Sequence, residues 1–85
     1  MATKVTWNRN SELDMDKYRV YVNGVLAGEV QQPPAGSKPE FIFPPGSEGS
    51  VNVSAVDKSG NESGKSSAVF FDNVPPAIPS GLVLA

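Results

Sequence analysis

Residues 17–26, with the sequence KYRVYVNGVL, carry the signal that decides the fold of this chain. Apolar or aromatic side chains at positions 18, 20 and 22 alternate with Lys17, Arg19 and Tyr21, which is the period of a half-buried β-strand. The dipeptide Asn23-Gly24 follows, and both residues accept the positive φ of a type I′ turn. We therefore predict a β-hairpin whose second strand covers residues 25–30.

Other segments on both sides of this hairpin alternate in the same way. We predict strands at residues 3–8, 41–43, 51–56 and 65–72. The side chains expected to face the core are Val5, Trp7, Tyr18, Val20, Val22, Phe41, Phe43, Val51, Val53, Ala55, Ala68 and Phe70. The polar stretch 8–16 is expected to form a loop that Leu13 anchors to the core.

The segments between these strands are rich in turn-forming residues. Pro33-Pro34-Ala35-Gly36 and Pro44-Pro45-Gly46 end strands, and residues 57–64 have the composition of a hairpin loop. No stretch has a helical period. With 85 residues, of which eight are glycine and eight are proline, the chain is predicted to be all-β, a small antiparallel β-sandwich of immunoglobulin-like type with one core.

The composition excludes most catalytic chemistry. The chain has no cysteine and no histidine, which removes thiol nucleophiles, imidazole bases and the usual zinc ligands. No nucleophile with a neighbouring base and no phosphate-binding glycine loop is found. We expect no enzyme activity, no catalytic residues and no cofactor.

The charge pattern also limits the classes of partner that we expect. The net charge is −2, and the basic residues are scattered singly, so neither nucleic acid nor a membrane surface is an expected partner. Oxygen ligands at Glu12, Asp14 and Asp16, or in the loop 57–62, have the composition of a calcium site, but we interpret both as solvated loops and expect no metal. Tyr21, which faces away from the core, is the candidate contact residue of the sheet.

The residues described so far resemble the fibronectin type III module, especially its bacterial and phage-associated forms. The resemblance covers nearly the whole chain and rests on Trp7, on the stretch Tyr18-Arg19-Val20-Tyr21 and, most specifically, on residues 51–57 followed by Ser59-Gly60-Asn61-Glu62-Ser63. Such a module often has a tyrosine where this chain has Gly49 or its neighbours, so a corner hydrogen bond is absent or rebuilt.

The resemblance also implies that the first strand of the module is displaced. Residues 1–73 correspond to a sandwich without that strand, and residues 74–85 resemble the Pro-rich joint and first strand of a module. We expect this segment to be donated to a neighbouring subunit through Ile78, Leu82, Val83 and Leu84. Pairing within the same chain and a disordered tail are the alternatives.

These features lead to expectations about function. A chain that begins with Met, has no export signal and carries a strand for a neighbour suits a structural protein that decorates or cements a phage virion after assembly in the host cytoplasm. The alternative is a spacer or binding module of a bacterial extracellular enzyme or adhesin, located outside the cell or on its surface. Weak glycan binding is a further possibility. None of these functions needs catalysis, and the fold alone does not choose among them, because the same sandwich carries many roles.

Overall fold

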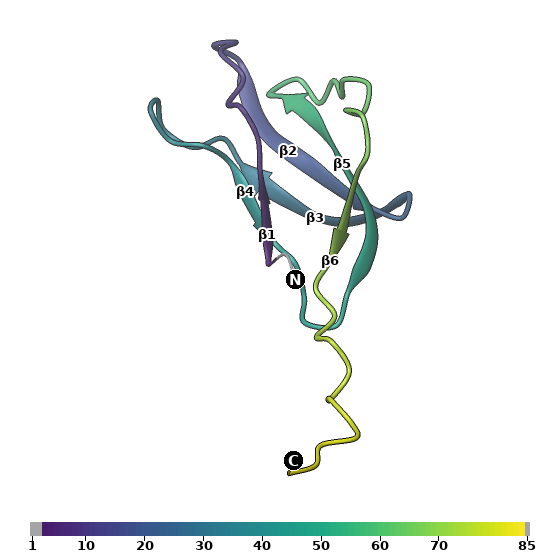
Figure 1. Cartoon of the computed structure of the whole chain (residues 1–85). Coiled ribbons are helices and arrows are strands. Elements are labelled where there is room, and N and C mark those ends of the chain that lie inside the picture. Colours follow the sequence, from purple (N-terminus) through teal and green to yellow (C-terminus); the bar gives the residue numbers. More distant parts are fainter. Residues whose placement is uncertain (1–2, 85) are drawn as a thin grey trace.

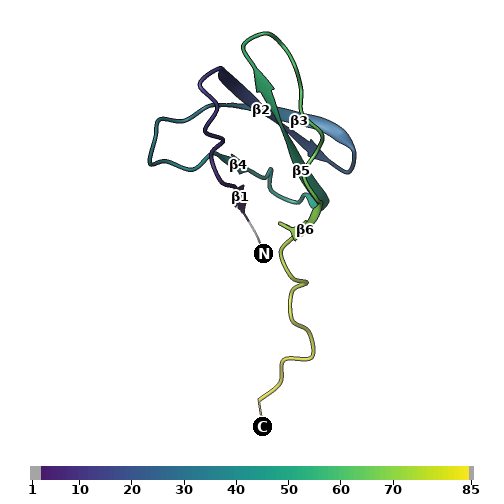
Figure 2. The ribbon, with the colours of Figure 1, turned by 90° about the horizontal axis from the view of Figure 1, so that it is seen from above.

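The computed structural model describes residues 3–84, which form two antiparallel sheets packed face to face (Figures 1 and 2). The strands are β1 (Lys4–Thr6), β2 (Met15–Val22), β3 (Val25–Gln31), β4 (Glu40–Ile42), β5 (Glu48–Asp57) and β6 (Val69–Asp72). One sheet has the order β1-β4 and the other the order β3-β2-β5-β6. The predicted all-β sandwich is confirmed.

The hairpin that the sequence predicted joins β2 to β3. Asn23 and Gly24 have φ angles of 53° and 81°, as a type I′ turn requires, and Val22 pairs with Val25 across it. The Asn23 side chain also accepts a hydrogen bond from the Ser50 amide and lies where a side chain at Gly49 would be. The turn is thereby tied to β5 near Gly49, where the modules that the sequence resembles often carry a tyrosine.

The core lies between the two sheets. Its buried members are Val20, Phe43, Val51 and Phe71, and Val5, Trp7, Val22, Val30, Phe41 and Val53 pack around them. The rings of Phe43 and Phe71 are stacked with their centroids 3.7 Å apart, which joins the end of β4 to β6. The inward positions predicted in β2 and at residues 5, 7, 41, 43, 51 and 53 are therefore confirmed.

Tyr18 is the centre of a buried set of hydrogen bonds next to the apolar core. It is 1% exposed, its ring packs edge to face on Trp7, and its hydroxyl accepts a hydrogen bond from the Asn10 amide and donates one to Gln32 Oε1, both of 2.7 Å. The Gln32 amide in turn donates to the Asn10 carbonyl. This triangle fixes the loop after β1 against the end of β3.

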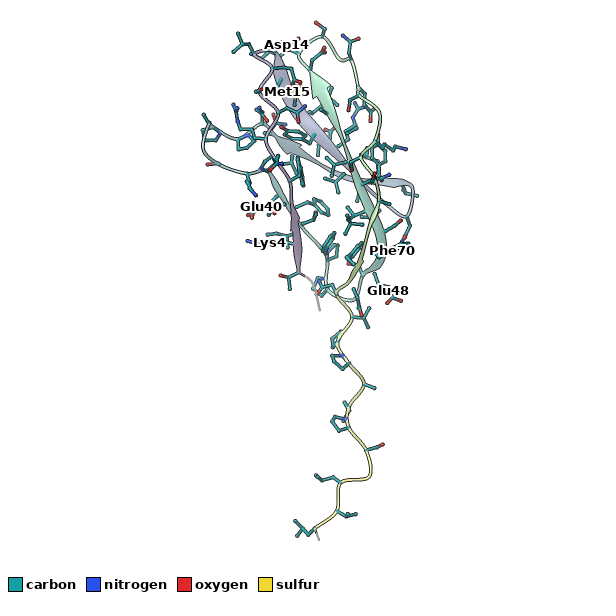
Figure 3. All side chains as sticks on the ribbon, turned by 45° about the horizontal axis from the view of Figure 1, so that its top comes forward. Lys4, Asp14, Met15, Glu40, Glu48 and Phe70 are labelled. Carbon is teal, nitrogen blue, oxygen red and sulfur yellow. The ribbon has the colours of Figure 1, made fainter. Side chains whose placement is uncertain are left out.

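The expectation that Leu13 anchors the first loop is wrong. Leu13 is fully exposed, and Met15, which is 8% exposed, is buried instead (Figure 3). The Met15 amide donates to the Glu12 carbonyl, which turns the chain outward at Leu13. A bulge between Met15 and Lys17 in the pairing with β5 then shifts the side-chain alternation and accounts for the burial of Met15.

The predicted inward face of the last strand is also wrong. Phe70 is 86% exposed and Ala68 is exposed, whereas Phe71 is 9% exposed. The regular strand begins only at Val69, because Ser63 and Ser66 use their hydroxyl oxygens to accept hydrogen bonds from the Ala55 and Val53 amides of β5. An alternation counted from Lys65 therefore starts in irregular backbone and misses the register by one residue.

Asn73 marks the end of the sandwich. It is 6% exposed, and its side-chain amide donates to the carbonyls of Phe43 (3.2 Å) and Pro44 (3.0 Å). Its backbone carbonyl accepts from Gly46. Beyond Val74 the chain runs away from the sheets as an extended segment (Figure 1). We call residues 74–84 the tail.

The strand order matches that of an immunoglobulin-type sandwich for all strands but the first. In that arrangement β1 and β4 take the places of strands B and E, and the larger sheet takes those of C′, C, F and G. Strand A, which lies beside strand B in such a sandwich, has no counterpart in residues 3–84. The side of β1 away from β4 is therefore an open edge.

Candidate interaction surfaces

The outer face of the larger sheet carries a network of paired charges. Alternation in β2 points Lys17, Arg19 and Tyr21 outward, and Glu29 of β3 lies opposite Arg19. The Glu29 carboxylate is 3.1 Å from both Lys17 Nζ and Arg19 Nε. These contacts, with Lys17 first, lower the pKa of Glu29. Surface pairs of this kind stabilise little by themselves but fix the geometry of the face.

Glu62 completes this network from the loop after β5. Its carboxylate accepts hydrogen bonds from the hydroxyls of Ser54 (2.6 Å) and Tyr21 and lies 2.8 Å from Arg19 Nη1. The Ser54 contact, followed by those of Tyr21 and Arg19, lowers the pKa of Glu62 from 4.5 to about 2. The loop is held on the sheet by a carboxylate that is ionised at neutral pH.

The shifted pKa of Glu62 predicts a loss of stability in acid. Because the folded-state pKa of about 2 lies below the unfolded value of 4.5, the contribution of Glu62 is complete above pH 4.5 and is lost as the pH falls towards 2. We expect the denaturation midpoint of Glu62→Gln to depend less on pH across this window than that of the parent chain. Glu12→Gln, on an exposed loop, is the control. A parent chain with the same pH dependence as Glu62→Gln would contradict the network.

The side chain of Tyr21 contacts other residues of the same chain. Its hydroxyl donates to Glu62, which raises the pKa of the phenol, and Lys65 Nζ lies 4.2 Å from the centre of its ring. The residue is half-buried under these partners. A contact role for Tyr21 stays a prediction, and a partner would have to displace Lys65 to reach the ring.

A second surface is a groove of about 510 Å³ along the open edge of β1. We call this space the groove; its lining includes Val5, Trp7, Tyr18, Val53, Ala55 and Val69. Val69 is 59% exposed although its position in β6 has the same alternation as buried Phe71. Inward-facing apolar side chains thus remain accessible where the sandwich lacks a cover.

Unused backbone groups run along the open edge of the groove. The Phe43 amide donates to the Thr3 carbonyl and the Trp7 amide donates to the Pro39 carbonyl, so odd-numbered residues of β1 bond to β4. The amides and carbonyls of Lys4 and Thr6 consequently face the open edge, where no strand of residues 3–84 pairs with them. Trp7 Nε1 is buried and has no hydrogen-bond partner among the described residues.

The predicted contact residues of the tail lie away from the sandwich. Ile78, Leu82, Val83 and Leu84 are 91%, 96%, 81% and 103% exposed. Figure 3 shows the extended segment that carries them running away from the two sheets. The tail is therefore not packed in the groove of its own chain. The donation of these residues to a neighbour stays a prediction.

Residues 3–84 contain no cluster of three or more acidic side chains arranged to hold a metal ion. None of their elements is a helix long and apolar enough to cross a membrane. Sequence reasoning missed Phe70, whose exposed ring projects from β6 (Figure 3), because its position was assigned to the core.

Comparisons with known proteins add one finding. No protein-family model matches the chain, so the likeness to fibronectin type III modules has no such support, and no curated protein matches significantly. A solved structure does match: the spore cortex lytic enzyme SleM of Clostridium perfringens, with 27% identity and a TM-score of 0.60. The similarity covers 86% of this chain but 25% of that chain, so this chain spans about a quarter of the length of SleM. The protein is thus a small all-β domain similar to part of a lytic enzyme.

Proposed function

We propose that this chain is a non-enzymatic accessory module, a spacer or binding module of a bacterial extracellular enzyme. The observation that carries this proposal is the similarity to SleM, which spans most of this chain and a quarter of the other. A domain that accounts for a quarter of a larger lytic protein suits a part that positions or attaches the rest. Of the two roles expected from the sequence, the comparison favours this module over a virion decoration protein.

The chemistry of the charged surface supports a role without catalysis. Glu62 has a pKa of about 2, so at neutral pH it is a weak base, and its oxygens already accept hydrogen bonds from Ser54 and Tyr21. Arg19 is bound to Glu29 and Glu62. The charged groups of this face hold one another and the loop, which is a structural use.

An exposed aromatic ring favours a second candidate, the binding of cell-wall glycan. Phe70 is 86% exposed on β6, and a flat apolar ring in this setting can stack on the apolar face of a sugar. Leu13 is equally apolar and fully exposed at a distant loop, so it offers a matched control. Binding through Phe70 would make the chain a binding module rather than a spacer.

Purified spore cortex tests both candidates. We expect the turbidity of a cortex suspension to stay constant with the purified chain, because the proposal assigns it no lytic activity. A fall in turbidity would overturn the proposal. If the chain sediments with the cortex, and if Phe70→Ala abolishes this binding while Leu13→Ala preserves it, the chain is a binding module. If the chain stays in the supernatant, it is a spacer.

A further inference from the structure

The tail has the pattern of the strand that the groove lacks. Ile78, Ser80, Leu82 and Leu84 alternate with Pro79, Gly81 and Val83, so an extended tail presents three large apolar side chains on one face. These apolar side chains are all more than nine-tenths exposed in the structure. An apolar strand without a cover and an apolar groove without a strand therefore occur in the same chain.

Hydrogen-bond geometry determines which residues of the tail can bond to the edge of β1. The backbone amides and carbonyls at the open edge of β1 belong to Lys4 and Thr6, whose side chains point away from the core. Residues opposite each other in antiparallel strands point to the same face, so the partner must bond through residues whose side chains also point outward. Gly81 and Val83 have this orientation when Leu82 and Leu84 point inward. Gly81 beside Thr6 and Val83 beside Lys4 bring Leu82 next to Val5.

The same register explains two details of the tail. Pro79, which has no amide hydrogen, falls beside Asn8, beyond the end of β1, where its missing donor costs no ladder bond. Ser80 falls beside Trp7, whose buried Nε1–H has no acceptor among the described residues. Gly81 has a φ of 75° in the free tail and must extend on docking, which glycine does readily.

The direction of the chain decides whose groove the tail fills. Thr3, just before β1, and Asn73, just after β6, both bond to Phe43, so the tail leaves at the pole where β1 begins. An antiparallel strand must instead start beside Asn8, at the other pole. To reach the groove of its own chain, the tail would have to reverse and then run back along the stretch 3–8. Residues 74–79 span about 20 Å at about 3.3 Å each, and the stretch 3–8 alone takes about 17 Å. Too few residues are then left for the reversal, which needs about two.

We propose that residues 78–84 of one copy add to the open edge of β1 in a second copy and fill its groove. The tail already runs in the direction of β6, which is the direction the added strand needs, so the second copy lies beyond the first along the tail (Figure 1). Each copy gives one strand and receives one. The contact is heterologous and produces head-to-tail chains.

Light scattering of the full chain over a wide concentration range tests the proposal. We expect the mass to rise with concentration and Trp7, the only tryptophan, to shift its fluorescence to shorter wavelength as the groove fills. Leu82→Asp places a charge in the groove and should weaken assembly at least about tenfold. Val83→Asp, which adds the same charge one residue later on the outward side, should assemble like the parent chain.

A cysteine pair reports the register, because the chain contains no cysteine. The double variant Lys4→Cys with Val83→Cys should give a ladder of disulfide-linked multimers on a non-reducing gel, since residues that exchange hydrogen bonds across antiparallel strands have Cα atoms about 5.5 Å apart. Lys4→Cys with Leu82→Cys, whose side chains lie on opposite faces of that ladder, is the control and should give little linkage.

Four results would overturn the proposal. The first is a monomer at every concentration. The second is assembly that leaves the Trp7 emission unchanged, which would place the tail elsewhere. The third is equal weakening by Leu82→Asp and Val83→Asp, which would indicate nonspecific association of an apolar tail. The fourth is a disulfide that closes within single chains of the Lys4→Cys, Val83→Cys variant, which would place the tail in the groove of its own chain.

Discussion

Replacement of Phe71 by alanine is expected to destabilise the protein by about 3–5 kcal/mol, the usual cost of truncating a buried phenylalanine. The Phe71 ring stacks on Phe43 at 3.7 Å and closes the end of the core where β6 meets β4. Domains of this size have a free energy of unfolding of about 4–13 kcal/mol, from about 0.05–0.15 kcal/mol per residue. A large part of the native stability should therefore be lost in a denaturant titration followed by circular dichroism.

The adjacent residue gives the matched control. Phe70→Ala removes the same side chain from a position that is 86% exposed, and we expect a change within about 0.5 kcal/mol. This pair of variants also separates the two registers considered for the last strand. If Phe70→Ala were the more damaging change, the alternation predicted from the sequence would be right and the register of β6 described above would be wrong.

Regular alternation explains why most of the fold could be predicted. The hairpin needs only local information, because Asn23-Gly24 sets the turn and the alternation on either side sets the faces. The same holds for Val5 in β1, for Trp7 just after it and for Phe43 after β4, which all pack in or against the core. Each of these segments keeps one period from end to end.

The errors lie where the period is interrupted. Met15 precedes a bulge, and residues 62–68 bond to β5 partly through serine hydroxyls, so the side-chain alternation restarts at a point the sequence does not mark. A shift of the register by one residue then places Phe71 rather than Phe70 in the core. Local hydrogen bonds made by side chains compete with the regular ladder and cannot be read from hydrophobic period alone.

The Glu62 network shows a different limit. The groups that contact its carboxylate, Ser54, Tyr21 and Arg19, lie 8, 41 and 43 residues away in the sequence. Nothing in the composition of the loop 57–64 distinguishes this glutamate from a solvated one. The network needs both the hairpin register and the return of the loop onto β5, so the low pKa is a property of the fold.

The groove, by contrast, follows from the strand order, because residues 3–84 provide no strand beside the open edge of β1. A two-stranded sheet of β1 and β4 opposite a four-stranded sheet leaves part of the larger sheet uncovered, and the exposure of Val69 is the physical result. Natural sandwiches protect such edges because an open edge pairs readily with another strand. The proposed addition of residues 78–84 would cover this edge and join identical chains without a separate linker.

Tyr18→Phe is expected to cost about 1–3 kcal/mol, because it removes one oxygen and leaves the Asn10 amide and Gln32 Oε1 without their partner. The ring stays, so its edge-to-face contact with Trp7 and the volume of the core should be preserved. The loss is therefore one of hydrogen bonds alone, and denaturant unfolding of the two proteins measures it directly.

Tyr21→Phe removes the same atom from the half-buried outer face, where water can replace the lost contact with Glu62, and it should cost less. Equal costs would show that the triangle formed by Tyr18, Asn10 and Gln32 does not hold the first loop in place.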